Sequence, residues 1–304
     1  MTRLSEALDR ARAGDSLASA APGASGAEAQ PAWSFDGAVT PDAPSTGAEA
    51  AVPDRPPLVG TLPSGEKLVV HADAEASLVE QFRRLAATLH HAQTQSDTRT
   101  VMIASAVEAE GKTLTATNLA LTLSESYQRR VLLVDADLRR PSVHGVFQLD
   151  NRAGLGDVLR NGIGDGKLPV HRVSANLWVL TAGKPTSDPM SLLISDTMRE
   201  FLVDAAEQFD WVVLDTPPVA LLPDANLLAA MIDTALLVVR ANSTPYPLSV
   251  RAVEAIGTQK ILGVVLNRAE KSEVAAGYNY YSYSYSHKAS TKPRRRFRLA
   301  FRKT

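Results

Sequence analysis

The sequence predicts an α/β fold in which helices cover both faces of a parallel sheet. Short apolar runs alternate with longer segments of helical periodicity from residue 75 onward. One of these runs, residues 130–135 (RVLLVD), is continuously apolar between its ends, as expected for a parallel strand that is buried on both faces. Such alternation is typical of layered α/β domains, whose ligands bind at the carboxyl ends of the strands.

The elements can be assigned in order along this pattern. A first helix is expected at residues 75–91, because Leu78, Phe82, Leu85 and Leu89 recur at three- and four-residue spacing. Apolar runs predict strands at residues 100–105, 130–135, 177–181, 211–215, 234–239 and 261–266. The segments between them predict helices at residues 112–127, 196–208, 224–231 and 247–258.

Composition divides the chain into four parts. Residues 1–13 are a candidate for a short amphipathic helix, either a docking element for a partner or a frayed terminal helix. Residues 14–57 are rich in Ala, Pro, Gly and Ser and are predicted to be a disordered linker, because they bury too little apolar area to offset ordering. The ordered domain is expected at residues 58–274, and residues 275–304 are expected to form a tail.

Composition also excludes several classes of protein. The chain has 304 residues, a formal net charge of −1, no cysteine, and no apolar run near the roughly 20 residues that a membrane span needs. Without cysteine there are no disulfides, no thiol catalysis and no Cys-based metal site. The balanced charge gives no support for a nucleic-acid partner. The charged N-terminus predicts no signal peptide, so we expect a cytoplasmic protein, peripheral at the inner face of the cell membrane.

The tail combines tyrosines with basic residues. Five of the seven tyrosines in the chain lie within eight positions, namely Tyr278, Tyr280, Tyr281, Tyr283 and Tyr285. Only Ser, Asn and Gly lie between and before them, so the rings have nothing to pack against and the segment is predicted to be solvated. From Lys288 onward there are eight basic residues and no acidic one. These suit either an anionic lipid surface or a solvated end that balances phosphotyrosine charge.

The segment 106–113 (AVEAEGKT) follows an expected strand and opens an expected helix. This is the context of a phosphate-binding loop, in which backbone N–H groups and the helix N-terminus hold the phosphates. Lys112 is expected to reach the β- and γ-phosphates, and the Thr113 hydroxyl to bind Mg²⁺. The loop is atypical at Ala106 and Ala109, where Gly is common. The predicted nucleotide contacts are Glu110, Gly111, Lys112, Thr113 and Leu114.

Two further strand ends carry acids. Asp135 and Asp137 leave the strand at residues 130–135 from the same side. Asp135 is a candidate to hold Mg²⁺ through water, and Asp137 is a candidate to accept a proton from an attacking hydroxyl. The segment 211–218 (WVVLDTPP) ends an apolar strand in Asp215, an arrangement in which the carboxylate helps to hold the metal. Asp224 begins the next expected helix, as an N-cap or as a neighbour of the site.

Taken together, the phosphate loop, VLLVDADLRRP, VVLDTPP and the tyrosine-rich tail resemble the bacterial tyrosine kinases (BY-kinases) of capsule and exopolysaccharide synthesis, over roughly residues 78–286. The resemblance implies an α/β parallel-sheet P-loop NTPase of the deviant Walker, MinD-like type. It implies an ATP- and Mg²⁺-dependent autokinase that phosphorylates the tail tyrosines and regulates polysaccharide polymerisation and export. Lys112 and Thr113 would be Walker A residues, Asp135 and Asp137 the Walker A′ pair with Asp137 activating the tyrosine, and Asp215 the Walker B acid.

The resemblance also implies partners and one base contact. The partners are a membrane chain-length determinant (co-polymerase) as activator, neighbouring subunits of a homo-oligomeric ring, and a cognate phosphotyrosine phosphatase. The family's subunit-contact motif spaces Glu, Arg and Arg three residues apart; here Glu80 and Arg83 fit, but the third position is Ala86. In related folds the position of Asn267 lies near the adenine, so Asn267 is a candidate base contact or, equally, a turn residue.

Two alternatives stay open at this point. An ATPase switch of the MinD/ParA partitioning type shares the sheet and the phosphate loop, and the basic tail would then anchor it to the membrane. Against it, Val107 stands where those proteins carry a signature Lys, and the tyrosine cluster has no purpose there. A non-catalytic scaffold is compatible with the altered loop, but the intact Lys112, Thr113 and strand-end acids argue against it.

Overall fold

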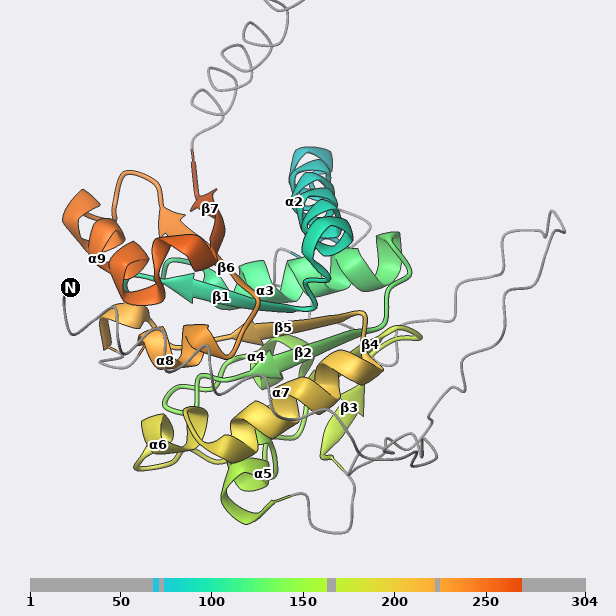
Figure 1. The fold of residues 1–304 in the computed structure, drawn as a ribbon. Helices are drawn as coiled ribbons and strands as arrows, with labels where there is room; N and C mark the ends of the chain where they lie inside the picture. Colours follow the sequence, from blue (N-terminus) through green and yellow to red (C-terminus); the bar gives the residue numbers. More distant parts are fainter. Residues whose placement is uncertain (1–67, 71–73, 163–167, 222–224, 270–304) are drawn as a thin grey trace, which may run out of the picture. The chain divides into compact units, whose positions relative to one another are not determined.

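The computed structural model describes residues 68–70, 74–162, 168–221 and 225–269 (Figure 1). The predicted N-terminal helix (residues 1–13), the linker (residues 14–57) and the tail (residues 275–304) lie outside the described residues, and so does Asp224. Those predictions stay predictions. No described helix is both long enough and apolar enough to cross a membrane.

The described residues contain one seven-stranded sheet in the order β3-β4-β2-β5-β1-β6-β7. All neighbouring strands pair in parallel except β3 with β4, which pair antiparallel. The strands are β1 Thr100–Ser105, β2 Val131–Asp135, β3 Val170–Arg172, β4 Leu177–Leu180, β5 Trp211–Asp215, β6 Thr234–Arg240 and β7 Ile261–Asn267. The predicted parallel α/β fold is therefore confirmed.

The helices connect these strands. They are α2 Ala76–Ser96, α3 Lys112–Leu121, α4 Val143–Phe147, α5 Leu155–Asn161, α6 Pro189–Leu193, α7 Asp196–Gln208, α8 Ala225–Ala230 and α9 Tyr246–Ile256. Short turns of other helix types lie at η1 Thr122–Ser126, η2 Val219–Leu221 and η3 Thr258–Lys260. The start of α7 shows how local chemistry sets a boundary, because the Ser195 hydroxyl accepts a hydrogen bond from the Met198 backbone N–H at 3.2 Å.

The core is divided by the sheet into two layers, because strand side chains alternate between its faces. In β1, Val101 and Ile103 join the layer formed with α2, α3 and α4, whereas Met102 and Ala104 join the layer formed with α5 to α9. Figure 1 shows α2 and α3 on one side of the sheet and α5, α6 and α7 on the other. Burial on both faces explains why the central strands are apolar throughout.

Three features differ from the sequence prediction. The antiparallel β3 and the short helices α4, α5 and α6 were not expected, because elements of three to seven residues leave little periodicity to detect. The helix expected at residues 112–127 changes at Thr122 into a π-helix. There the Thr122 hydroxyl donates to the Asn118 carbonyl at 2.7 Å and the Ser124 hydroxyl to the Leu121 carbonyl at 3.2 Å, so side chains compete for the helical acceptors.

Candidate active site

The site lies at the carboxyl ends of three adjacent strands. β2, β5 and β1 are neighbours in the sheet, and each is followed by one of the predicted motifs. Asp135 and Asp215 are paired in register at the ends of β2 and β5. The fold thus brings together segments that are far apart in the sequence, at the edge where α/β sheets bind ligands.

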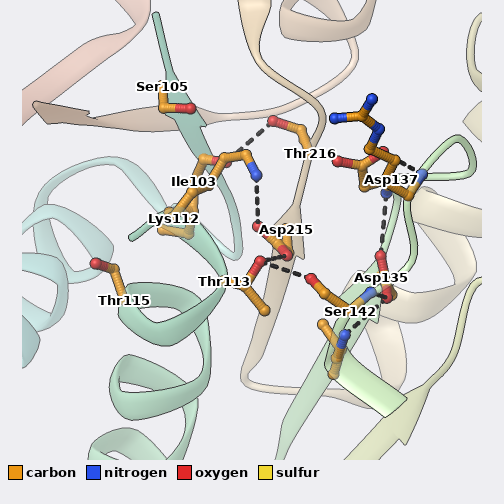
Figure 2. A network of polar contacts seen from close by, with 12 residues as sticks. Ile103, Ser105, Lys112, Thr113, Thr115, Asp135, Asp137, Ser142, Asp215 and Thr216 are labelled. Atoms are coloured by element: carbon orange, nitrogen blue, oxygen red, sulfur yellow. Dashed lines mark hydrogen bonds and ion pairs between the residues drawn. The ribbon is translucent and has the colours of Figure 1, made fainter. Parts of the chain in front are cut away.

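Lys112 and Thr113 converge on Asp215 (Figure 2). The Lys112 Nζ lies 3.6 Å from the Asp215 Oδ1, and the Thr113 hydroxyl donates to the Asp215 Oδ2 at 2.6 Å. The Asp215 side chain is fully buried, and its Oδ1 has no hydrogen-bond partner within the described structure. Thr113 also shares a hydrogen bond of 2.9 Å with the hydroxyl of Ser142, which the sequence analysis did not identify.

Asp135 organises the loop that follows β2. Its Oδ2 accepts from the backbone N–H groups of Ser142 and Val143, and its Oδ1 accepts from that of Asp137. Asp137 in turn accepts from the Arg140 backbone N–H at 3.0 Å. The loop is therefore wound around the two carboxylates, so that Asp137 faces the pocket described below.

The two strand-end acids are held in an unfavourable electrostatic setting. Burial, and then the neighbouring Asp215 charge, raise the pKa of Asp135 to about 7, although three backbone N–H groups oppose the shift. Burial likewise raises the pKa of Asp215, although Lys112 and Thr113 oppose it. Because both carboxylates are buried and resist ionisation, a cation bound next to them would stabilise their charged forms.

Glu110 braces the phosphate loop from inside the protein. Its Oε2 accepts from the Val107 backbone N–H at 2.8 Å, and its Oε1 accepts from the Thr244 hydroxyl and the Arg240 backbone N–H. The side chain is thus turned away from the pocket, and the predicted nucleotide contact of Glu110 would have to come from its backbone N–H. Sequence alone could not show this, because Arg240 ends β6 and Thr244 lies in the turn that follows it, far from the phosphate loop along the chain.

Asn267 lies against the back of the same loop. Its side-chain amide donates to the Glu110 carbonyl at 2.8 Å. A Cβ on Gly111 would lie 2.0 Å from the Asn267 Nδ2, and Gly111 has a φ of +92°, so this position requires glycine. Asn267 therefore fixes the loop, and its contact with an adenine base stays a prediction. Leu114 is half-buried and packs on the layer that includes α2 and α3.

Ala109 is strained. It has a φ of +62°, in the left-handed region where Cβ crowds the following carbonyl and glycine is preferred. The unusual Ala that the sequence showed at this point thus adopts the conformation that a Gly would adopt without strain. Ala106, the other departure, is fully buried.

A pocket of about 360 Å³ opens between the phosphate loop, the loop after β2 and the loop after β5. Its lining combines the predicted Lys112, Thr113 and Asp137 with residues that the sequence analysis did not single out as site residues: Glu108, Ala109, Arg139, Arg140, Ser142, Pro217 and Pro218. The Arg140 guanidinium forms an ion pair with Glu108 across the two loops. Such a pairing across loops could not be predicted, because it depends on the strand order.

The oxygen donor atoms of the site suit a Mg²⁺ ion that is also bound by phosphates. Thr113, Asp135 and Asp215 offer only oxygen atoms, and Mg²⁺ is usually held by one or two carboxylates with water and substrate phosphates. Among the described residues no group of three or more His, Cys, Asp or Glu side chains could hold a metal by itself. The oxygen donors of Thr113, Asp135 and Asp215 fit a Mg²⁺ ion that is held together with nucleotide phosphates.

The predicted subunit-contact positions lie on α2. Glu80 and Arg83 are exposed, whereas Ala86 is fully buried. Glu80 is paired instead with Arg84 at 3.3 Å, one turn along the helix. A third arginine at position 86 would have to enter the core, which is a physical reason for the departure from the motif.

Comparisons with known proteins identify the family of this chain. Residues 101–281 match the family described as the CobQ/CobB/MinD/ParA nucleotide binding domain. The tyrosine-protein kinase YwqD of Bacillus subtilis is 35% identical over 204 residues, which are 66% of this chain and 85% of that protein. The tyrosine-protein kinase etk of Escherichia coli (strain K12) is 36% identical over 207 residues, 67% of this chain but only 28% of that protein.

Solved structures give the same result. The kinase domain of the Escherichia coli tyrosine kinase ETK has a TM-score of 0.60 and 30% identity, and the match covers 68% of this chain and 84% of that one. The chimerical protein CapA2B2 has a TM-score of 0.61 and 28% identity, covering 71% and 95%. MinD and ParA share only the broad family, so the partitioning-type alternative is a distant relation.

Proposed function

Because the chain belongs to the bacterial tyrosine-protein kinases within the CobQ/CobB/MinD/ParA nucleotide-binding family, we propose that it transfers the γ-phosphate of ATP to tyrosines of its own C-terminal tail. One observation carries the proposal. Lys112 and Thr113 of the phosphate loop converge on the buried Asp215 and line the same pocket as Asp137. This places a phosphate-binding cation, a hydroxyl and a buried carboxylate beside a carboxylate that can serve as a base.

Each residue has a proposed role in the transfer. The backbone of Glu110 to Leu114 binds the phosphates at the start of α3, and Lys112 neutralises the β- and γ-phosphate charge. Thr113, Asp135 and Asp215 hold Mg²⁺, which when bound neutralises charge that develops on the phosphates. The tyrosine oxygen forms a bond to the γ-phosphorus, the bond from that phosphorus to the bridging oxygen of ADP breaks, and Asp137 accepts the phenolic proton.

Partners and location follow as further parts of the proposal. We propose that the chain is a cytoplasmic kinase at the inner face of the membrane and that a membrane chain-length determinant activates it. A phosphotyrosine phosphatase would remove the phosphates again. The kinase would regulate exopolysaccharide or capsule production. The likeness to CapA2B2 supports assembly into a homo-oligomer. The exposed Glu80 and Arg83 on α2 are the proposed subunit contacts.

The test is to map phosphate on the full chain after incubation with ATP and Mg²⁺. Tandem mass spectrometry is expected to place phosphate on Tyr278, Tyr280, Tyr281, Tyr283 or Tyr285. Lys112→Met is expected to stay free of phosphate, because the charge that holds the γ-phosphate is lost. ATP hydrolysis without any phosphotyrosine would reject the kinase in favour of a switch ATPase. Absence of both activities would favour a scaffold, or a kinase that requires its membrane activator.

A further inference from the structure

Two arginines stand at the rim of the pocket, immediately after the proposed base. Arg139 and Arg140 both line the pocket and are exposed. They follow Asp137 by two and three positions, and the Arg140 backbone N–H is bonded to the Asp137 carboxylate at 3.0 Å. Their guanidinium groups are therefore tethered close to the place where an acceptor tyrosine must present its hydroxyl.

The partner of Arg140 is easily exchanged. Its ion pair with Glu108 leaves 75% of the Arg140 side chain and 49% of the Glu108 side chain exposed. Exposed pairs of this kind contribute only about 0–1 kcal/mol, because water and salt screen them. A phosphate group, with a charge of about −1.5 to −2 and three acceptor oxygens, binds arginine more strongly and with two parallel hydrogen bonds.

The tail carries tyrosines at a spacing that suits this geometry. Tyr281 and Tyr283 are two residues apart, as are Tyr283 and Tyr285, and Tyr278 and Tyr280. In an extended peptide, residues two apart project from the same side and lie about 7 Å from each other. A tail that bound in this extended form with one tyrosine at Asp137 would bring the tyrosine two positions away to the rim.

We propose that Arg139 and Arg140 bind a phosphotyrosine two positions from the acceptor, so that each phosphate added to the tail favours addition of the next. The inference rests on the proposed kinase function and deepens it. It makes the tail a cooperative acceptor: chains that carry one phosphate become better substrates than unmodified chains. Glu108 then acts as a weak competitor that occupies Arg140 until a phosphotyrosine displaces it.

The test uses peptides with the sequence of residues 277–288, in which Tyr281 is the sole acceptor and the other tyrosines are Phe. One peptide carries Phe at position 283, a second carries phosphotyrosine at 283, and a third carries phosphotyrosine at 285. The enzyme is the full chain with its five tail tyrosines changed to Phe, so that only the peptide gains phosphate.

We expect kcat/KM for the peptide phosphorylated at 283 to exceed that of the Phe peptide by about tenfold, as for a charge-assisted contact. The peptide phosphorylated at 285, with the wrong spacing, is expected to gain little.

Variants assign the effect to the rim. The double change Arg139→Ala with Arg140→Ala is expected to reduce the preference to about one, and Arg140→Lys alone to keep part of it, because a point charge replaces a bidentate contact. Arg130→Ala is the matched control: Arg130 also forms an exposed ion pair, with Asp210 at 3.8 Å, but it precedes β2 at the opposite edge of the sheet. The control is expected to keep the full preference.

A second measurement uses the wild-type chain itself. Early in the reaction, intact mass spectrometry is expected to show more doubly phosphorylated chains than random addition would give, and the double arginine variant is expected to give the random distribution. Equal kcat/KM for the Phe and phosphotyrosine-283 peptides, or a preference that survives the double change, would overturn the inference while leaving the kinase intact. If neither peptide nor the wild-type tail gains phosphate, the kinase function itself fails.

Discussion

At the amino edge of the sheet, Asp233 accepts hydrogen bonds from the backbone N–H groups of Arg99 and Thr100 and from the Thr100 hydroxyl, all within 2.9 Å. At the carboxyl edge, Asp215 is fully buried, leaves its Oδ1 without a hydrogen-bond partner among the described residues, and has a pKa raised by burial. Both acids flank the central strands. The first carboxylate stabilises the fold through its hydrogen bonds. The second is buried and faces the Lys112 ammonium at 3.6 Å, so we propose the carboxyl edge as the place of chemistry.

The largest expected effect concerns the carboxyl edge. Asp137→Asn removes the proposed proton acceptor, so the rate of phosphate addition to the tail is expected to fall by roughly 10²- to 10⁴-fold. Nucleotide affinity is expected to persist, because Asp137 is not among the proposed phosphate or metal ligands. Quench-flow or timed mass spectrometry measures the rate, and titration with a fluorescent nucleotide measures affinity. A variant with an undiminished rate would show that Asp137 is not the base.

The amino edge is expected to respond in stability instead. Asp233→Ala removes three hydrogen bonds, and water can replace the lost acceptor only in part because Asp233 is exposed but the Thr100 bonds are half-buried. The free energy of unfolding is therefore expected to fall by about 1–2 kcal/mol. Glu207→Ala, an exposed acid on α7, is the control and is expected to change it by less than about 0.5 kcal/mol. Chemical denaturation measures both, and equal stabilities would remove the structural role assigned to Asp233.

Strain in the phosphate loop is expected to have a smaller effect. Ala109→Gly relieves a φ of +62° and is expected to raise the free energy of unfolding by about 1 kcal/mol. Gln148→Gly, at a φ of +53° beyond the end of α4, relieves the same strain away from the pocket. Nucleotide affinity is expected to stay the same in both variants, since the loop already has its binding conformation. Tighter binding in Ala109→Gly alone would show that the loop rearranges when nucleotide arrives.

The last expected effect is a dependence of stability on pH. The pKa of Asp135 is about 7 in the folded chain and 3.8 as the ordinary value, so the folded state binds the extra proton between these limits. The free energy of unfolding of the nucleotide-free protein therefore loses this contribution as pH rises from about 4 to 7. Asp135→Asn is expected to give a shallower decline in denaturation experiments at several pH values. Parallel curves for the two proteins would contradict the raised pKa.

Some elements were predicted to the residue, and the reason is physical. Strands β1 and β5 and helix α7 begin and end where apolar periodicity and polar flanking residues placed them. The acids at the ends of β2 and β5 were found because a buried run that ends in Asp is a strong local signal. Their mutual placement was not predictable in detail, since strand order is set by packing.

The features that were missed depend on contacts between distant segments. Ser142 belongs to the site because its hydroxyl shares a hydrogen bond with that of Thr113. Arg140 reaches the phosphate loop through its ion pair with Glu108. The side chain of Glu110 turned inward because Thr244 and Arg240 meet it there. None of these pairings leaves a periodicity or a motif in the sequence, so only the folded chain reveals them.

The contrast between the two edges can be tested in one experiment with Asp215→Asn and Asp233→Asn. Phosphates per chain are counted by intact mass spectrometry after incubation of each full-length protein with ATP and Mg²⁺, below the unfolding temperature of the less stable variant. We expect no phosphate on Asp215→Asn and the wild-type number on Asp233→Asn, despite the lower stability of Asp233→Asn. Wild-type phosphorylation of Asp215→Asn would contradict the assignment of the carboxyl edge as the site of phosphate transfer.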